Sequence, residues 1–427
     1  MAGRDLMDTK YLSTRCCVVG GGPAGVMLGF LLPRAGVDVV VLEKHADFLR
    51  DFRGDTIHPS TLELMHELGL LDEFLKLPHR KVRRLAVQIG ATSLTIADFT
   101  HLPTVCKFIA LMPQWDFLEF LATHARRFQG FHLLMDTSAT DVMLDGDRVV
   151  GVRATSDNGA IEIRADLVVG ADGRRSTVRS SAGFKADNLG APMDVLWMRL
   201  SRRPDDGSEA FGHVEGNRMF IMLDRGDCWQ CAFVIPKGSA DELMKTDIGA
   251  FRGMILEMSP WLGERVNELK AWNDVKLLTV AVDRLRRWHR PGLLCIGDAA
   301  HAMSPIGGVG INLAVQDAVA AANILAEPLR GGTLTDDHLA RAGPPRMADP
   351  RDPIHSTRHP KPRGPPRARR GRTVEAAFHP EAARLAAGAS RHPGALGRDR
   401  SAAGARPHRR GDADFGLTRL RAAAPAS

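Results

Sequence analysis

Strand-like and helix-like hydrophobic patterns alternate from residue 15 to residue 339, which is typical of a mixed α/β enzyme. An apolar strand at 16–19 leads through a glycine-rich turn into an apolar helical pattern, and a second apolar strand follows at 37–42. Pro33 falls late in the predicted helix and should shorten or kink it. The N-terminal pattern therefore predicts a strand–helix–strand unit.

Two later apolar strands each end in a turn that contains Asp-Gly or Gly-Asp. One lies in DLVVGADGRRSTVR, residues 166–179, and the other in LLCIGDAAHAMSPIGGVGIN, residues 293–312, which leads into a predicted helix over 313–326. Between 184 and 272 the pattern is rich in strands, for example VLWMRLS, NRMFIMLD and DCWQCAFVIP. This region predicts a second, mostly antiparallel sheet.

The alternating pattern ends near residue 341. The last 86 residues hold 17 Arg, one Lys and only nine Val, Ile, Leu, Met and Phe together, too few apolar residues to offset the entropy of ordering them. We predict that residues 342–427 form a disordered or aberrant basic tail. Because Arg, Pro, Ala, Gly and His dominate it, we interpret it as a frameshift product, a hypothesis that an intact reading frame in the resequenced gene would exclude.

Charge and cysteine content narrow the class of protein. The net charge of the whole chain is +7, but the tail alone carries +11, so residues 1–341 carry −4 and do not indicate a nucleic-acid partner. No signal peptide and no stable membrane insertion are predicted, and six cysteines in this length fit a reducing, cytoplasmic setting. Cys228 and Cys231 form a single CxxC, which we interpret as small apolar residues on a strand rather than a metal or redox pair.

The glycine-rich turn after the first strand carries a dinucleotide-binding fingerprint. Gly20 permits the tight turn, Gly22 lets a pyrophosphate approach, and Gly25 lets helix and strand pack, while the helix N-terminus attracts phosphate. Glu43, at the end of the second strand, can accept hydrogen bonds from ribose hydroxyls and favours NAD or FAD over NADP here. The residues predicted to bind the dinucleotide in this unit are Gly20, Gly22, Pro23, Ala24, Gly25, Glu43 and Lys44.

The three motifs together resemble the signature of the flavin monooxygenases typified by para-hydroxybenzoate hydroxylase, over residues 15–341. The resemblance implies FAD as cofactor, with Asp298 on its ribityl chain and the loop 305–312 along the isoalloxazine. Backbone amides at a helix N-terminus would stabilise the negative charge of reduced flavin. The residues implied in this loop are Pro305, Gly308, Gly310, Ile311 and Asn312.

The same resemblance implies further cofactor contacts. Asp172 and Gly173 match the motif that touches both FAD and the nicotinamide cofactor, and Arg53 and Gln114 match positions that contact FAD. The sequence contains one dinucleotide fingerprint, whereas a reductase with a dedicated NAD(P)H domain would show a second. NAD(P)H is therefore expected to bind transiently as the reductant and to leave. No metal is expected.

The implied fold is a discontinuous Rossmann-like FAD-binding domain with an inserted substrate domain. We predict that residues 1–80, 103–184 and 273–341 form the FAD-binding domain and that 81–102 and 185–272 form the substrate domain. The implied reaction is hydroxylation of a small aromatic or other electron-rich substrate by NAD(P)H and O2, through a flavin C4a-hydroperoxide. A homodimer is compatible with this organisation.

The catalytic acid or base stays unassigned. Some relatives use a tyrosine relay, but the one tyrosine, Tyr11, precedes the first motif. His58 and His213 are candidate bases, although most histidines in a protein are structural or exposed. The side chains of Trp197, Met222 and Trp229 belong either to the pocket wall or to the core.

Four alternatives remain beside the hydroxylase. A flavin halogenase would require tryptophans at 231 and 233, where this chain has Cys231 and Phe233, and is disfavoured. An oxidoreductase of the same fold that acts on its substrate without inserting oxygen is compatible with all of the sequence motifs. An inactive flavin-binding remnant would follow from the aberrant C-terminus, and a nucleic-acid binder using the tail has the least support.

Overall fold

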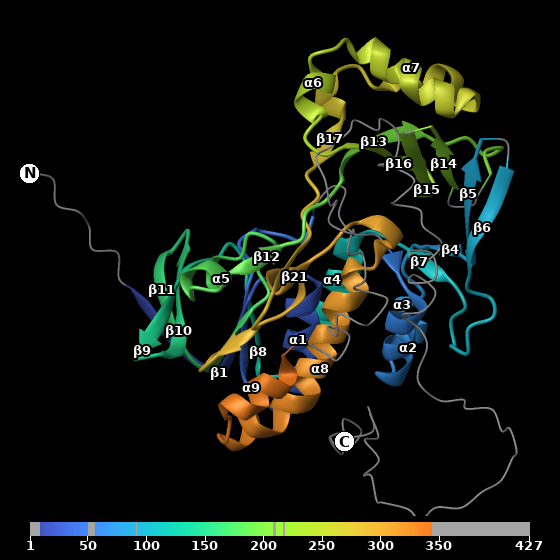
Figure 1. Ribbon diagram of the computed structural model, residues 1–427. Helices are drawn as coiled ribbons and strands as arrows, with labels where there is room; N and C mark the ends of the chain where they lie inside the picture. Colours follow the sequence, from blue (N-terminus) through green and yellow to red (C-terminus); the bar gives the residue numbers. More distant parts are fainter. Residues whose placement is uncertain (1–8, 50–55, 91, 208–210, 217, 344–427) are drawn as a thin grey trace, which may run out of the picture.

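The computed structural model describes residues 9–49, 56–90, 92–207, 211–216 and 218–343 (Figure 1). The predicted basic tail from residue 344 onward and the candidate Arg53 lie outside the described residues.

The first of two large sheets is built on a parallel core. Its path runs β8-β2-β1-β11-β20, all parallel, with β19 antiparallel at the β20 edge and β10 and β9 extending from β11. The strands are β1 (Lys10–Val19), β2 (Val39–Leu42), β8 (Phe131–Leu134), β9 (Ser138–Asp145), β10 (Arg148–Ser156), β11 (Gly159–Gly170), β19 (His289–Arg290) and β20 (Leu293–Cys295). Parallel strands buried on both faces read as continuous apolar runs. The sequence predicted such runs in β1, β2, β11 and β20, where 16–19, 39–42, 167–170 and 293–295 are buried, but it did not predict β8.

Helices cover one face of this parallel core (Figure 1). Helix α1 (Pro23–Arg34) packs against α8 (Gly310–Gly331) and α4 (Gln114–Ala125), and α9 (Asp336–Ala342) packs against α8. Pro33 lies in the last turn of α1, which ends one residue later, as its position predicts. The helix predicted over 313–326 extends further in both directions.

Helix α8 is apolar along much of its length, although the sequence predicted no stable membrane insertion. Within the described residues, Ile306–Gly331 is long and apolar enough to cross a membrane, although half of its most apolar window is buried in the protein. Its side chains Ala318, Ala321, Ala322 and Leu325 are fully buried in the main core cluster. This is the behaviour of a core helix.

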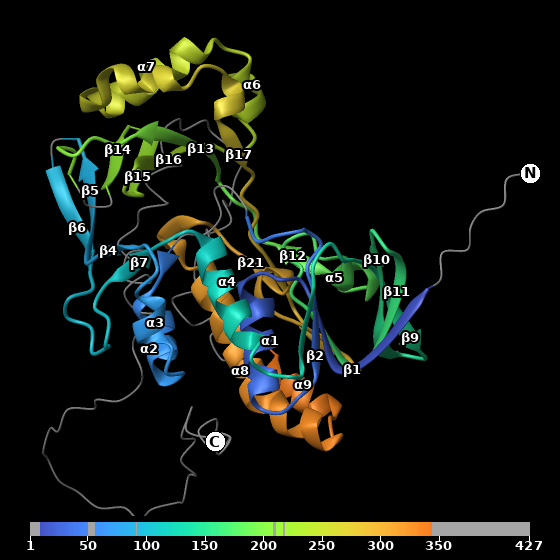
Figure 2. The ribbon, with the colours of Figure 1, turned by 180° about the vertical axis from the view of Figure 1, so that it is seen from behind.

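The second large sheet is mostly antiparallel, as predicted, with one parallel pair between β14 and β5. Its order is β17-β13-β16-β15-β14-β5-β6, and α6, α7 and η1 cover one face (Figure 2). Its elements are β5 (Arg84–Ile89), β6 (Thr92–Asp98), β13 (Met193–Ser201), β14 (Phe211–Glu215), β15 (Arg218–Asp224), β16 (Cys228–Pro236), β17 (Lys276–Leu278), α6 (Ala240–Met244), α7 (Ile248–Met258) and η1 (Pro260–Glu268).

Short elements connect the two large sheets. One small sheet joins β12, β18 and β21, another joins β3, β7 and β4, and short helices lie before or after them. These elements are β3 (Thr56–Ile57), α2 (Pro59–Glu67), α3 (Leu71–Phe74), β4 (Arg80–Val82), β7 (Ile109–Leu111), α5 (Thr177–Ser181), β12 (Ala186–Asn188), η2 (Trp272–Asp274), β18 (Asp283–Leu285), η3 (Gly297–Ala299), β21 (His301–Ala302) and η4 (Ile306–Gly308).

The strand pairing bears on the predicted domain division, which stays a prediction. Strand β12 follows the predicted boundary at 185, yet it pairs with β18 beside the first sheet. Strand β17 follows the boundary at 272, yet it pairs with β13 in the second sheet. A division by sheets would therefore assign β12 to the FAD-binding domain and β17 to the substrate domain.

The two faces of the second sheet have different surroundings. Odd-numbered residues of β16 and even-numbered residues of β15 pack with Phe251 and Ile255 of α7 in one apolar cluster. The alternate residues form another cluster, against which Ile306 packs from the loop before α8. Because side chains alternate along a strand, the sheet has one face toward the helices and one toward that loop.

The alternation also separates the two cysteines of the CxxC. Cys231 is fully buried on the helical face, while Cys228 is partly exposed at the start of β16, and both are free thiols. Burial raises the pKa of both thiols. Their reactivity is accordingly low.

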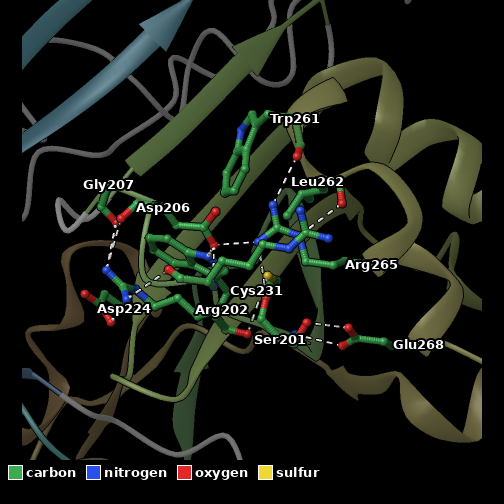
Figure 3. Close-up of polar contacts among 12 residues, drawn as sticks. Ser201, Arg202, Asp206, Gly207, Asp224, Cys231, Trp261, Leu262, Arg265 and Glu268 are labelled. Atoms are coloured by element: carbon green, nitrogen blue, oxygen red, sulfur yellow. Dashed lines mark hydrogen bonds and ion pairs between the residues drawn. The ribbon is translucent and has the colours of Figure 1, made fainter.

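A buried ion pair fixes the helical layer on the second sheet (Figure 3). Arg265 of η1 and Asp206, in the loop after β13, are 5% and 6% exposed, with Nη1 and Oδ2 2.5 Å apart. Trp229 Nε1 donates to the same carboxylate at 2.8 Å. Burial alone raises the pKa of Asp206, but the hydrogen bonds that it accepts, led by Arg265, outweigh burial and lower the pKa.

We expect Asp206→Asn to reduce the free energy of unfolding by about 3–5 kcal/mol, because breaking a buried pair leaves Arg265 as an uncompensated charge. The Asp206 pKa is lowered in the folded state, so its contribution is present above the ordinary carboxyl pKa and is lost as pH falls through the folded value. Urea denaturation at several pH values measures both effects.

The exposed pair Lys245–Glu242 provides the matched control. Glu242→Gln should leave the denaturation midpoint unchanged. Equal midpoints for Asp206→Asn and wild type at neutral pH would show that the buried pair does not stabilise this layer.

Candidate functional site

The glycine-rich turn lies at the carboxyl end of β1, and its three fingerprint glycines do different things. Gly20 has φ +109°, and a Cβ there would lie 2.4 Å from the Ala171 carbonyl oxygen. A Cβ on Gly25 would lie 1.8 Å from the Gly20 carbonyl oxygen, whereas one on Gly22 would meet no atom within 4 Å. Gly20 and Gly25 are therefore needed for packing, and Gly22 leaves the backbone open to a ligand.

The end of β2 faces this turn. Glu43 Oε2 accepts the Gly21 N–H at 3.0 Å, and Oε1 accepts the His45 N–H at 3.2 Å. The carboxylate is thus held beside the first turn of α1, where Pro23 and Ala24 begin the helix. Lys44, the next residue, is exposed.

The second motif forms a tight turn after β11. Asp172 accepts Ser176 Oγ at 2.5 Å and the Val178 N–H at 3.2 Å. Burial raises the pKa of Asp172 despite these hydrogen bonds. Gly173 has φ +84°, and a Cβ there would meet nothing within 4 Å, so the backbone here is also open.

Arginines join the second motif to the third. Arg174 Nε lies 3.9 Å from Asp298 Oδ2, and the Asp298 side chain is 44% exposed. Arg179 donates to the carbonyl oxygens of Arg174 at 2.6 Å and Ala299 at 3.4 Å. The turns after β11 and β20 therefore lie side by side, with the Asp298 carboxylate accessible.

The loop 305–312 is fastened to β3 and α2, about 250 residues earlier in the chain. Asn312 is 3% exposed: its Oδ1 accepts the His58 N–H and Thr61 Oγ, each at 2.8 Å, and its Nδ2 donates to the carbonyl oxygens of Thr56 and Gly308. Thr56 Oγ donates to the Gly308 carbonyl oxygen at 2.5 Å. These contacts fix the backbone that the sequence predicted to lie along the flavin.

The N-terminus of α8 emerges from this fixed loop. The first hydrogen bond of the helix runs from Leu313 to Val309 at 3.0 Å, so the N–H groups of Gly310, Ile311 and Asn312 precede the helical ladder. The Ile311 side chain is 6% exposed in the core, which leaves its backbone as the group able to face a ligand. Pro305, at the other end of the loop, is partly buried.

The two candidate bases are both buried. His58 Nε2 lies 3.1 Å from the Gly307 carbonyl oxygen, and burial lowers the His58 pKa to about 4, so the neutral ring donates this hydrogen bond. His213 lies opposite Phe220 on the helical face of the second sheet, 8% exposed. Tyr11 is 74% exposed on β1. The catalytic acid or base therefore stays unassigned.

The sequence did not decide whether Trp197, Met222 and Trp229 belong to the pocket wall or to the core, and the structure places them on different faces of the second sheet. Met222 and Trp229 belong to the cluster with α7 and are core residues. Trp197, partly buried, packs with Ile221 and Ile306 on the opposite face. The face toward the loop is therefore apolar around Trp197 and Ile221, which are partly accessible, while Arg199 and Gln230 lie on the same face nearer the start of β16.

The structure brings most predicted positions to one edge of the first sheet: the turns after β1, β11 and β20 and the loop before α8. Gln114 lies at the first turn of α4, partly buried, and its predicted contact with FAD remains a prediction. Sequence reasoning missed Thr56, Arg174 and the pair His301–Asp317. No local motif marks Thr56 or Asp317, because their partners are far away in sequence.

The geometry fits FAD at that edge. The backbone is open at three glycines of these turns. A Cβ added at Gly22, Gly173 or Gly310 would meet no protein atom within 4 Å. Two helix N-termini and one held carboxylate, Glu43, supply groups for pyrophosphate, flavin and ribose. No group of three or more His, Cys, Asp or Glu able to hold a metal occurs among the described residues.

Comparisons with known proteins agree with this fit. Residues 13–343 match the family described as FAD binding domain. The 6-methylpretetramide 4-monooxygenase of Streptomyces rimosus is 33% identical over 341 residues, which cover 79% of this chain and 81% of that one. A rifampicin monooxygenase of Streptomyces venezuelae is 28% identical, and the match spans 70% of this chain but 61% of the relative.

Solved structures share the fold. Pseudomonas aeruginosa PqsL, solved with 2-aminobenzoylacetate, superposes with a TM-score of 0.67 at 24% identity, covering 77% of this chain and 90% of that one. The myxobacterial halogenase CndH superposes with a TM-score of 0.66 at 20% identity, covering 77% and 78%. A probable FAD-dependent monooxygenase and a halogenase therefore share this architecture, and the fold alone does not separate them. On the family match over residues 13–343 and the relative that is 33% identical over 341 residues, the chain belongs to the FAD binding domain family, as one of its FAD-dependent monooxygenases.

Proposed function

We propose that this protein hydroxylates an electron-rich aromatic substrate with O2, using NAD(P)H as a transient reductant. The observation that carries the proposal is the apolar region around Trp197 and Ile221 on the second sheet, both partly accessible, opposite the loop 305–312. An aromatic ring between a flavin and such a face would be shielded from water on both sides.

The proposed FAD site uses the residues predicted from sequence. The pyrophosphate would lie against Gly22 and the N-terminus of α1, the adenosine ribose against Glu43, and the ribityl chain against Asp298. The isoalloxazine would lie along 305–312, near the amides that begin α8. Bound FAD supplies the electron transfer and oxygen activation, and the protein orients both partners and excludes water.

The backbone near α8 favours an electron-rich flavin. The unpaired N–H groups at a helix N-terminus carry partial positive charge, which stabilises an anion placed against them. Asn312 and Thr56 hold this helix start in place. The electrostatic groups are therefore fixed before the cofactor binds, which is the condition for effective stabilisation.

Substrate and reductant remain the open choices. The 33% identical relative is named for 6-methylpretetramide, which makes that compound the first to test, followed by simpler phenols. The described fold shows one dinucleotide fingerprint, at Gly20–Gly25, so we propose that NADH or NADPH binds near Asp172 and Gly173 and leaves. We also propose a cytoplasmic location, because the six cysteines fit a reducing compartment, and a homodimer, on the family resemblance.

Two alternatives differ in observable ways. An oxidoreductase of this fold without oxygen insertion would oxidise its substrate without adding an oxygen atom. An inactive remnant would retain FAD weakly and be poorly soluble. That alternative depends on residues 344–427, which lie outside the described residues.

We expect the purified protein to be yellow and to be bleached anaerobically by one of NADPH and NADH, faster with a suitable phenol present. Readmitted O2 should be consumed with formation of a product that is heavier than the substrate by one oxygen atom. Stopped-flow absorbance and mass spectrometry measure the two steps. Substrate-dependent bleaching with no oxygen atom in the product would favour the dehydrogenating alternative.

We expect Gly22→Ala to weaken FAD binding while the apoprotein stays folded, because the added methyl meets no protein atom and the residue has an ordinary φ of −76°. The methyl would occupy the space proposed for the pyrophosphate. Fluorescence titration of apoprotein with FAD, with circular dichroism as the folding check, measures this.

Gly25→Ala is the matched contrast. Its methyl would lie 1.8 Å from the Gly20 carbonyl oxygen, so this variant should lose the fold of the turn as well as the cofactor. Full FAD affinity in Gly22→Ala would place the pyrophosphate elsewhere.

We expect Ile221→Ala and Met222→Ala, adjacent residues on opposite faces of β15, to separate binding from stability. Met222 is fully buried under α7, so its truncation should cost about 2–5 kcal/mol in the free energy of unfolding. Ile221→Ala should chiefly raise the substrate KM, because that side chain faces the proposed substrate. Steady-state kinetics and urea denaturation of both variants test this, and an unchanged KM in Ile221→Ala would remove that face from the pocket.

A further inference from the structure

A buried histidine–carboxylate pair lies directly behind the Gly-Asp turn of the third motif. His301 Nε2 on β21 and Asp317 Oδ2 on α8 are 2.6 Å apart, and their side chains are 19% and 6% exposed. The same Oδ2 accepts the N–H of Gly297 at 2.8 Å. One carboxylate oxygen therefore holds both the histidine and the residue that precedes Asp298.

Gly297 has little freedom to move away from this contact. It has φ +58°, and a Cβ there would lie 3.1 Å from Ala24 Cβ of α1 and 3.5 Å from Ala314 Cβ of α8. The turn is thus packed between the two helices of the proposed cofactor site. A shift of Asp317 would move Gly297 and, with it, the adjoining Asp298.

Several groups fix the His301 ring and its charge. The ring stacks on Trp288, with centroids 4.9 Å apart and planes at 24°. Burial alone lowers the His301 pKa, but the hydrogen bond and charge of Asp317, with smaller contributions from Asp298 and Asp283, outweigh burial and raise it. The raised pKa favours the imidazolium, which makes the bond to Asp317 charge-assisted.

The other acidic groups around His301 have cationic partners of their own. Asp283 of β18 lies 3.3 Å from Arg179 of α5, and Asp298 of η3 lies 3.9 Å from Arg174. Arg284 lies opposite His301 in the pairing of β18 with β21. Among the described residues, the recorded partners of the Asp317 carboxylate are His301 and the Gly297 N–H.

We infer that His301 and Asp317 are positioning residues that lock the Gly-Asp turn for FAD, so that cofactor affinity depends on the protonation of His301. The inference rests on the proposed role of Asp298 in the FAD site. It adds a proton-linked control that acts through the turn and not through contact with the flavin. Loss of the His301 proton weakens the bond to Asp317 and removes a positive charge near the binding site of an anionic cofactor.

The sign of the pH dependence follows from the proposed tighter binding of FAD when His301 is charged, and the raised His301 pKa sets the pH range in which that charge is lost. The charged lock is fully present below the ordinary histidine pKa of about 6.5 and is lost as pH rises through the higher value of the folded protein. We expect the FAD Kd of wild-type apoprotein to increase by about tenfold between about pH 6 and about pH 9.

The test measures FAD binding to folded apoprotein by fluorescence titration across this pH range. His301→Gln retains a hydrogen-bonding side chain but no titrating charge, so its Kd should be weak and independent of pH. His132→Gln changes an exposed histidine on β8 and should keep the wild-type profile. Calorimetry in two buffers of different ionisation enthalpy should show proton uptake on FAD binding in wild type and none in His301→Gln.

A wild-type pH profile in His301→Gln would overturn the inference, as would equal proton uptake in the two proteins. Asp298→Asn separates this from failure of the proposed site. Unchanged FAD affinity in Asp298→Asn would overturn the cofactor placement itself. Weakened affinity in Asp298→Asn beside an unaltered profile in His301→Gln would leave the placement intact and reject the lock alone.

Discussion

Close backbone contact at the carboxyl ends of β1 and β11 is the constraint on which the rest of the site depends. The Gly20 position approaches the Ala171 carbonyl oxygen so closely that any side chain would collide with it, and Gly25 approaches Gly20 in the same way. Because no side chains intervene, the start of α1 packs directly against the edge of the sheet. Once that is fixed, the N-terminus of α1, the Glu43 carboxylate and the turn of Asp172 must share one edge, because parallel strands all end there.

The second dependence is long-range: the loop that begins α8 is shaped by a segment near residue 58. Asn312 uses both ends of its amide on β3 and α2, and burial without these partners would be costly. The positive φ values of Gly307 and Gly308 make the loop possible, but the hydrogen bonds select one conformation from the many that glycine permits. Hence a loop rich in glycine can still be rigid.

Features that depend on residues close together in the sequence could be predicted from it, whereas features that depend on distant residues could not. The strand–turn–helix motifs around Gly20, Asp172 and Asp298 are local, so spacing and residue type predicted the mixed α/β fold with its second antiparallel sheet. The partners of Asn312 and Asp317 are set by tertiary packing, and no periodicity reveals them. His58 looked like a candidate base because histidine titrates near neutral pH, whereas burial keeps it neutral as a hydrogen-bond donor to Gly307. The faces of Trp197 and Trp229 could be separated only after strand register was known, since a one-residue shift exchanges them.

The second sheet shows how one layer can satisfy opposite demands. On the helical face, Asp206 and Arg265 are buried together, which fixes the position of η1 because any other docking would leave a charge unpaired. On the other face, apolar residues from β13 and β15 lie opposite the loop, where a fixed ion pair would compete with an aromatic substrate for space and would attract water. The Asp206–Arg265 pair lies on the helical face, and the contact of Gln230 with Arg225 lies near the start of β16 on the other face, which leaves the region of Trp197 and Ile221 apolar for a hydrophobic ring. The alternation of side chains along each strand is what lets a single sheet meet both requirements.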